Sequence, residues 1–216
     1  MELPEVVPST LGGDVAVDFF NTVDWRLDPD RRHERLTTYL HLLSWVRQVG
    51  LFSDDEVQAL ARQADEHPEA AAAEHARVIE LRDDTYDALN ENREPAALPS
   101  AVRSAYAGSE LRRVPGGAWT WVPARLDLTA LRHRLTLELA RLLTSEKIVR
   151  FHRCEDRHCG WVFLDMSRRH DRRWCSAAEC GNRNRVRAHY ARTKKRPSAG
   201  ARRRGVEALT EGRPRS

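Results

Sequence analysis

The stretch "WCSAAECGNRNRVRAHYARTKKR" (residues 174–196) places two cysteines directly before seven lysine and arginine residues. Cys175 and Cys180 form a C-x4-C pair that repeats the spacing of Cys154 and Cys159, and the chain contains only these four cysteines. Paired spacing of this kind is typical of a zinc site, because four thiolates fill the tetrahedral coordination of Zn²⁺ and leave no position for water or substrate. We therefore expect one structural zinc ion on these four residues.

Two alternatives to a zinc site on four cysteines have to be considered. Four reduced cysteines could simply be buried in a core, although a core does not require equally spaced pairs. His152, His158 and His170 lie nearby in the sequence, and histidine is another common zinc ligand. Since four thiolates already saturate the ion, we expect the histidines to lie outside the site.

The segments around the cysteines predict a small finger with a strand and a helix. "GWVFLD" (160–165) has the pattern of a short strand, and "SAAECGNRNRVRAHYARTKK" (176–195) that of a helix, an order that resembles a treble-clef finger. On this helix Val186 and Tyr190 should pack inward. Gly181 should supply a backbone conformation that residues with side chains resist. Trp161 and Trp174 stand in apolar contexts and should belong to the core.

Charge divides the chain into two unlike parts. Residues 1–149 hold 17 Lys and Arg against 25 Asp and Glu, a net charge of −8, whereas residues 150–216 hold 19 against 7, a net charge of +12. Clustered like charges favour a polyanionic partner, so nucleic acid is the leading candidate, ahead of an acidic protein surface or the acidic part of this chain. The candidate nucleic-acid-binding residues are Arg168, Arg169, Arg172, Arg173, Arg183, Arg185, Arg187, Arg192, Lys194, Lys195 and Arg196.

The acidic part reads as mostly helical. Apolar residues recur at helical spacing in 36–50 and 127–144, and in 14–23, where a short strand is the competing interpretation. Ser53 and Glu56 form a capping box that predicts a helix over 54–66, and Pro68 begins another that runs to Asn92. "ELRRVPGGAWTWVPA" (110–124) predicts a β-hairpin. The expected fold class is α+β, a mostly helical domain followed by a small zinc finger.

The remaining features limit the location and the chemistry of the protein. The sequence shows neither an apolar run long enough to span a membrane nor a secretory signal, so we expect a cytoplasmic protein, associated with the nucleoid if it binds DNA. Residues 197–216 are poor in large apolar groups and are expected to form a disordered basic tail. No nucleophile is paired with a base and no phosphate-binding glycine loop is present, so we expect no enzyme.

Asp18, Asn21 and Arg26 are candidate ligand-binding residues in the N-terminal part. Asp18, Asn21 and Asp24 recur at three-residue spacing and would share one polar side of a helix, with Arg26 nearby. They could line a pocket for a small-molecule effector. Helix caps and hydrogen bonds within the domain are the more ordinary roles for such residues.

The tetrapeptide Cys180-Gly181-Asn182-Arg183 and its surroundings resemble a known family. Residues 154–192 are similar to the finger of the bacterial CGNR zinc-finger proteins, and "VDFFNTVDWR" (17–26) resembles the opening motif of the ABATE domain that precedes this finger. The resemblance implies a stress-induced transcription regulator, with a sensing or assembly domain over residues 1–149 and a DNA-binding finger over 150–196. Homodimerisation is one role that the first domain could have.

Two other functions stay open from the residues alone. The finger and the basic tail could bind RNA, or the finger could be the scaffold of a protein-interaction adaptor. Asn182 could brace the loop or contact a base, and Arg183 could brace the loop or bind phosphate. DNA binding remains the leading prediction.

Overall fold

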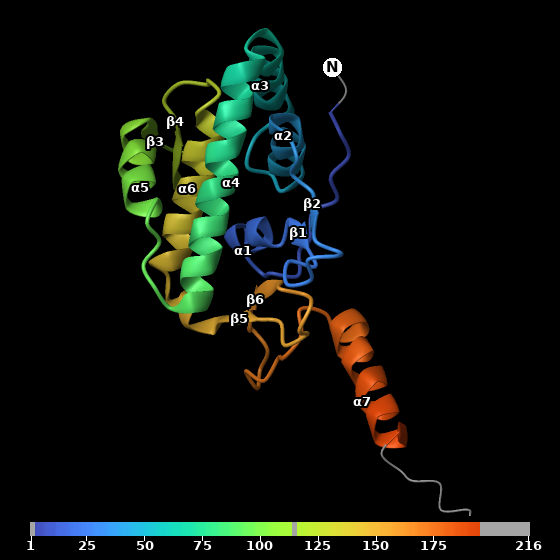
Figure 1. The fold of residues 1–216 in the computed structure, drawn as a ribbon. Coiled ribbons are helices and arrows are strands. Elements are labelled where there is room, and N and C mark those ends of the chain that lie inside the picture. The colour runs from blue at the N-terminus through green and yellow to red at the C-terminus, as the bar shows by residue number, and fades with distance from the viewer. Residues whose placement is uncertain (1–2, 114–115, 195–216) are drawn as a thin grey trace, which may run out of the picture.

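The computed structural model describes residues 3–113 and 116–194, which form an α+β fold (Figure 1). Helices dominate, and the strands of the described residues form three separate antiparallel pairs, so the predicted fold class is confirmed. Lys195, Arg196 and the predicted tail over 197–216 lie outside the described residues. The N-terminal helices are α1 (Val15–Phe20), α2 (Tyr39–Gln48), α3 (Asp54–Glu66), α4 (Pro68–Glu91), α5 (Leu98–Ala107) and α6 (Ala130–Leu143).

One apolar core joins most of these helices. The long helix α4 runs between the α5–α6 pair and the α2–α3 pair, and α1 lies near its C-terminal half (Figure 1). Phe19, Trp45, Leu60, Val78 and Leu131 come from α1, α2, α3, α4 and α6, and each is fully buried. Burying one such side chain stabilises the fold by about 1.5–3 kcal/mol, so this core is the main source of stability for the helical part.

A buried arginine fixes the chain between α1 and α2. Arg82 of α4 is fully buried, and its guanidinium lies 2.6 Å from the Glu34 carboxylate and 3.0 Å from that of Asp83. It also donates a 2.8 Å hydrogen bond to the Thr22 hydroxyl. A buried charge is tolerated only when it is paired and hydrogen-bonded in this way. The contacts hold the short strands β1 (Val23–Asp24) and β2 (His33–Glu34), which pair with each other, against α4.

The helix boundaries follow the local signals in the sequence. Ser53 and Glu56 make the predicted capping box at the start of α3, and Pro68 occupies the first turn of α4. Gly50 follows α2 in the left-handed region (φ 74°), and Asn92 ends α4 in the same region (φ 55°). Residues 14–23 contain the helix α1 rather than the alternative strand.

Helix α5 was not predicted from the sequence. The segment "REPAALPS" has the composition of a loop, but Pro99 falls in the first turn of α5. A proline in that turn removes a backbone N–H that has no partner within the helix anyway. Leu98 and Ala105 are buried, and α5 packs against α6 (Figure 1). Tertiary packing therefore stabilises a helix in a segment whose composition is typical of a loop.

The predicted hairpin is confirmed. Strands β3 (Ser109–Arg113) and β4 (Trp119–Pro123) pair antiparallel, with Leu111 opposite Trp121. Trp121 packs edge-on against Tyr106 of α5 with 4.9 Å between ring centroids, which holds the hairpin on the helical part. Val114 and Pro115 of the turn lie outside the described residues.

The C-terminal region shares its central strand with the helical core. It consists of the 3₁₀ turn η1 (Glu146–Arg150), the antiparallel strands β5 (Phe151–Arg153) and β6 (Val162–Leu164), the π-helical turn η2 (Ala177–Gly181) and α7 (Asn182–Lys194). Successive side chains of a strand point to opposite faces. Val162 and Leu164 accordingly enter the helical core, whereas Phe163 packs against the four cysteines.

Helix α7 extends away from the rest of the chain (Figure 1). None of its residues is buried. In the described part of the chain, no helix is both long enough and apolar enough to cross a membrane.

Candidate metal centre

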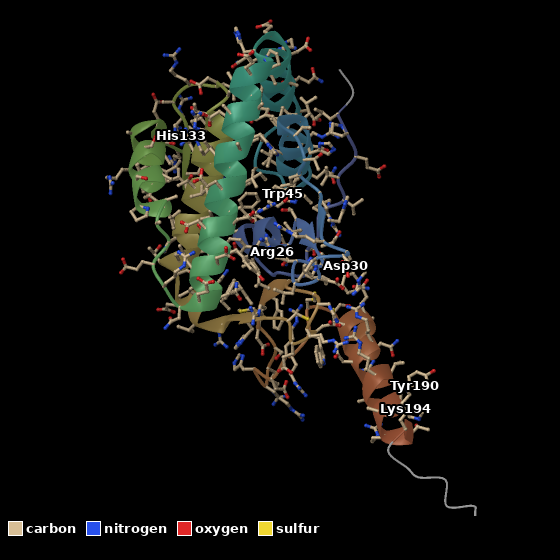
Figure 2. All side chains as sticks on the ribbon, in the orientation of Figure 1. Arg26, Asp30, Trp45, His133, Tyr190 and Lys194 are labelled. Atoms are coloured by element: carbon tan, nitrogen blue, oxygen red, sulfur yellow. The ribbon has the colours of Figure 1, made fainter. Side chains whose placement is uncertain are left out.

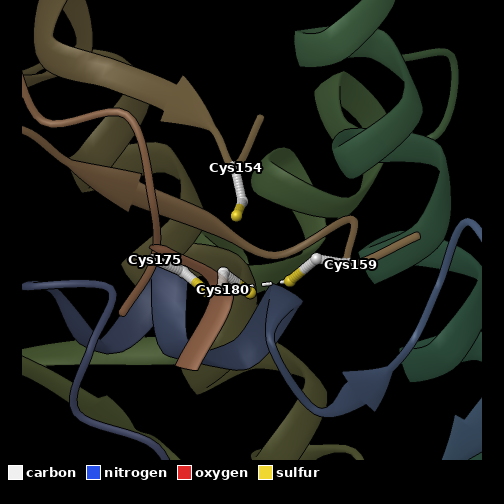
Figure 3. A group of neighbouring side chains, drawn as sticks. All are labelled: Cys154, Cys159, Cys175 and Cys180. Carbon is white, nitrogen blue, oxygen red and sulfur yellow. Dashed lines mark hydrogen bonds between the residues drawn. The ribbon is translucent and has the colours of Figure 1, made fainter. Parts of the chain in front are cut away.

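The four cysteines converge on one point (Figure 3). Their Sγ atoms all lie within 4.8 Å of one another, and Cys175 Sγ is 3.6 Å from Cys159 Sγ and 3.5 Å from Cys180 Sγ. Sulfurs placed about 2.3 Å from one tetrahedral Zn²⁺ are about 3.8 Å apart, so these thiols fit a zinc ion. All four side chains are buried, which suits a structural site closed to substrate.

The local folds that present the thiols come from both halves of the finger. Cys154 follows β5, and Cys159 precedes β6, so the first pair lies in the turn of this hairpin. Cys180 lies in the π-helical turn that leads into α7. Phe163 is buried against the thiols. Trp161 and Trp174 pack half-buried against this cluster, so the expectation that they belong to the core is met only in part.

The prediction for Gly181 is wrong in its physical reason. Its backbone is not in the left-handed region that favours glycine. A Cβ atom at this position would instead lie 3.1 Å from Cδ1 of Trp174, closer than most real Cβ contacts. A side chain here would therefore require the Trp174 ring to shift by a few tenths of an ångström.

The histidines near the cysteines are engaged elsewhere. His158 Nδ1 lies 3.2 Å from the Asp28 carboxylate, and the His170 ring contacts the Arg150 guanidinium. The His152 ring stacks near Phe163 with 6.1 Å between centroids. Among the described residues, the group that could hold the metal contains cysteines only.

Asp156, between the first two cysteines, joins the metal centre to α7. Its fully buried carboxylate accepts hydrogen bonds from Arg183 Nε (2.8 Å), Asn184 Nδ2 (3.0 Å) and the His158 backbone N–H (3.1 Å). The Arg187 guanidinium lies 3.4 Å away. Burial alone would raise the pKa of Asp156, but these hydrogen bonds and the nearby guanidinium groups lower it, so the carboxylate stays charged. The start of α7 is therefore tied to the first cysteine pair.

Arg183 braces the metal centre and also reaches the N-terminal part. Its Nη2 donates to Cys180 Sγ at 2.9 Å, a contact that favours the thiolate. Its guanidinium lies 4.4 Å from the ring centroid of Trp25, and the Arg31 guanidinium stacks on the same ring at 3.6 Å. Trp25 itself adopts a left-handed backbone (φ 50°), which is rare for a bulky residue and costs energy that the surrounding contacts must offset.

Sequence reasoning missed the roles of Trp25, Asp156 and Asn184. Trp25 belongs to the "VDFFNTVDWR" motif, and Asp156 lies inside the first cysteine pair, so both were within stretches already singled out. Acidic residues between two metal ligands, here Glu155 and Asp156, could have indicated partners for the arginines. No local pattern indicates which arginines each of them binds.

The structure separates the candidate nucleic-acid-binding residues into two groups. Arg172, Arg173, Arg183 and Arg187 serve contacts within the chain. Arg172, for example, donates to the backbone carbonyls of Trp174 and Cys175, while Arg173 pairs with Glu155. The exposed group, which has no ion-pair partner among the described residues, comprises Arg168, Arg169, Arg185, Arg192 and Lys194.

The exposed group occupies a short loop and α7. Asp165 caps the loop: one carboxylate oxygen accepts the Ser167 N–H and the other the Arg172 N–H, each at 2.9 Å. The Ser167 side chain, together with these two backbone hydrogen bonds, lowers the pKa of Asp165 to about 2. The hydrogen bonds hold Arg168 and Arg169 at the tip of a fixed turn.

The expectation that Val186 and Tyr190 pack inward is wrong. Val186 is 45% exposed and Tyr190 is 65% exposed. Figure 2 shows Tyr190 and Lys194 on the projecting part of α7, away from the rest of the chain. The helix has the predicted periodicity, but no element of the described chain lies beneath this face.

Asp18, Asn21 and Arg26 all form contacts within the chain. Asn21 is buried, and its side chain pairs with both backbone groups of Val162, accepting from N–H at 2.8 Å and donating to C=O at 2.9 Å. Asp18 accepts the Gly12 N–H at 2.8 Å, and Arg26 pairs with Asp83 at 2.9 Å. These contacts favour the intramolecular roles over an effector pocket at these side chains.

Asn21 and its neighbours form a seam between the two parts of the chain. The Leu164 N–H donates to the Gly12 carbonyl, and the Arg26 N–H donates to the Cys159 carbonyl. The Tyr86 hydroxyl donates to the carbonyl of Gly160, whose positive φ (75°) and close approach to Arg26 leave no room for a Cβ. The finger is therefore packed onto α1 and α4.

An open cavity of about 580 Å³ lies at this seam. Trp25 and Arg35 line it from the N-terminal part, and Trp161, Asn182 and Arg183 line it from the finger. Cys159, Cys175 and Cys180 also line it. The cavity adjoins both the metal centre and the first turn of α7.

Two family models match the chain in the order expected from the motifs. Residues 13–146 match ABATE, described as "Putative stress-induced transcription regulator", and residues 150–193 match the CGNR zinc finger. Neither description names an enzymatic activity. Comparison with curated proteins gives no match.

The finger match and the thiol geometry together identify the metal. The chain carries a zinc finger, and Cys154, Cys159, Cys175 and Cys180 are the residues that would hold its one structural zinc ion. The ABATE match covers more than half of the chain and is followed directly by the finger. The chain therefore belongs to the ABATE family and carries a C-terminal CGNR zinc finger.

Proposed function

We propose that this protein is a transcription regulator whose zinc finger binds duplex DNA. The observation that carries the proposal is a set of exposed cations, without ion-pair partners among the described residues, on a scaffold fixed by the metal centre. They are Arg168, Arg169, Arg185, Arg192 and Lys194. A phosphate polymer is the partner that such a set fits best.

The acidic part of the chain does not neutralise these cations. Within the described residues, the contact of a basic group with a carboxylate that joins the two parts is His158 Nδ1 with Asp28, and the ion pairs of the finger are internal to it. The positive surface is therefore available to an external polyanion. This observation speaks against screening of the finger by direct ion pairs with the N-terminal part.

Salt-dependent binding tests the proposal. Purified, zinc-loaded protein is titrated against a labelled random duplex by fluorescence anisotropy at 50 and 200 mM salt. Five phosphate contacts predict that the affinity falls by roughly 500-fold between about 50 and 200 mM. Arg168→Ala with Arg169→Ala should weaken binding and reduce the salt slope, whereas Arg103→Ala, which removes an exposed cation of α5, should change neither.

Competition separates DNA binding from the two alternatives. An RNA of equal length that displaces the duplex at a lower concentration would favour an RNA-binding protein. An acidic polypeptide that displaces it equally well would favour an adaptor. Absence of duplex binding at 50 mM salt would overturn the proposal.

A small-molecule effector and a homodimer remain predictions for the N-terminal part. If an effector binds, the cavity at the seam is the most direct route from it to the finger, because Trp25 and Arg183 both line that space and contact each other. A ligand there would contact Asn182, the first residue of α7. A change of duplex affinity in Trp25→Ala without loss of zinc would support this route.

A further inference from the structure

We propose, resting on the proposed function, that the outer face of α7 enters the major groove of duplex DNA and contacts base edges there. Three residues form this face, Arg185, His189 and Arg192. The finger would then contribute sequence preference, and not only attraction to phosphate.

Helix α7 is held at one end and free along its length. Its first turn is anchored to Asp156 through Arg183 and Asn184, while none of its residues is buried. Its 13 residues span about 20 Å and extend from the body of the protein (Figure 1). Isolated helices of this length are marginal in water, so a binding partner along α7 would stabilise it.

The anchor defines which side of α7 faces outward. Arg183, Asn184 and Arg187 reach Asp156, so their side of the helix faces the finger. At 100° per residue, Arg185, His189 and Arg192 follow one another at spacings of four and three, on the side opposite this anchor. All three are exposed, and Arg185 makes a 3.4 Å contact with the carbonyl of Ala177.

The positive charge of α7 favours a polyanionic binding partner. Between Asn182 and Lys194 the helix carries five lysine and arginine residues and no acidic residue. Three of the arginines lie in its first half, where the helix dipole disfavours cations. A second copy of this helix would be repelled, whereas phosphates on either side of a groove would be attracted to it.

The shape of a single projecting helix selects B-form DNA over duplex RNA. A helix with its side chains is about 10–12 Å across, and the major groove of B-DNA is about 12 Å wide. The major groove of A-form RNA is deep and too narrow for side chains to read. Arginine pairs through two hydrogen bonds with O6 and N7 of guanine, so Arg185 and Arg192 predict guanines in the preferred site.

The experiment separates two contributions of this face to DNA binding, its positive charge and its paired hydrogen bonds to bases. The full-length, zinc-loaded protein is used to select binding sites from a random duplex pool, and affinities for the selected and an unrelated duplex are then measured. Arg185→Lys and Arg192→Lys keep the charge but lose the paired hydrogen bonds. Arg103→Ala is the control for a cation elsewhere, and zinc content is measured for each variant.

The proposal predicts a loss of preference without a loss of general affinity. Each lysine variant should bind the unrelated duplex within about twofold of the unchanged protein but prefer the selected duplex about tenfold less. Methylation of guanine N7, which blocks the major-groove edge, should abolish the preference. An RNA duplex of the selected sequence should bind more weakly than the DNA.

The possible results separate this inference from the proposed function. If no duplex binds, both fail. If the duplex binds but shows no site preference, or if both lysine variants and N7 methylation leave the preference unchanged, DNA binding stands and the major-groove contact is overturned. Equal binding of duplex RNA likewise overturns it.

Discussion

The two parts of this chain use arginine in opposite ways. In residues 3–149, twelve of the seventeen lysine and arginine residues pair with a carboxylate, namely Arg26, Arg31, Arg32, Arg35, Arg47, Arg77, Arg82, Arg93, Arg112, Arg132, Arg134 and Arg141. In residues 150–194, three of twelve do so, namely Arg173, Arg183 and Arg187. The first part uses most of its Lys and Arg side chains in ion pairs within the chain, whereas the second leaves most of them without a carboxylate partner among the described residues.

The same contrast holds for the cores. The helical part is stabilised by a large apolar cluster, whereas the buried cluster of the finger consists of four cysteines and Phe163. So small a cluster does not support a fold without a further crosslink. The finger therefore depends on the metal and on its attachment to α1 and α4. Four changes test this division, from the largest expected effect to the smallest.

Removal of zinc should break the contrast most strongly. Apparent zinc affinities of finger peptides correspond to about 10–16 kcal/mol, so chelation, or Cys154→Ser with Cys180→Ser, should unfold the turn that carries the first cysteine pair and α7. Hydrogen exchange should show loss of protection there and retained protection in α2, α3 and α4. His152→Ala, outside the ligand set, should retain zinc. Full protection of α7 after chelation would contradict the metal-dependent core.

Asn21→Ala should weaken the seam. The change leaves the N–H and C=O of Val162 buried without partners, and each such group costs about 1–3 kcal/mol. The free energy of unfolding, measured by urea denaturation, should fall by about 2–5 kcal/mol. Asn90→Ala, which removes one hydrogen bond within α4, should cost about 1 kcal/mol or less. Equal losses for the two variants would show that the seam has no special role.

Asp18→Asn should change the pH dependence of stability. Burial raises the pKa of Asp18 to about 6, against the Gly12 hydrogen bond that lowers it. A folded-state pKa above the unfolded value means that stability is present at low pH and is lost as pH rises through 6. Relative to the variant, the unchanged protein should lose up to about 3 kcal/mol of unfolding free energy between about pH 4 and 7.5. Parallel curves for protein and variant would contradict the raised pKa, and Asp30→Asn is the exposed control.

Asp156→Asn should loosen α7 while the zinc stays bound. The variant loses the charge that Arg183 and Arg187 share, and it places an amide donor opposite a guanidinium. We expect local opening of α7 to become easier by about 1–3 kcal/mol in hydrogen exchange, with unchanged zinc content. Glu155→Gln breaks the exposed pair with Arg173 and should have no measurable effect. Similar exchange in both variants would remove Asp156 from the anchor of α7.

The elements with strong local signals could be predicted from the sequence. The capping box at Ser53, Pro68 at the start of α4 and the paired cysteine spacing each depend on neighbours within a few residues or on one coordination geometry. Helix α5 lacked such a signal, since Pro99 was ambiguous between a loop and a first helical turn. The exposure of Val186 and Tyr190 could not be predicted from the sequence. Helical periodicity shows which residues share a face, but it does not show whether another element packs against that face.

The sequence by itself determined the α+β class, the four zinc ligands and the concentration of positive charge after residue 150, because composition and ligand spacing are properties of the chain alone. Only the tertiary structure decided that Asp156 binds Arg183 and Arg187, that Asn21 holds Val162, and that Arg185 and Arg192 stay exposed. These outcomes depend on which distant groups meet. Residues of one type are chemically identical in the sequence, and burial and partners make them different.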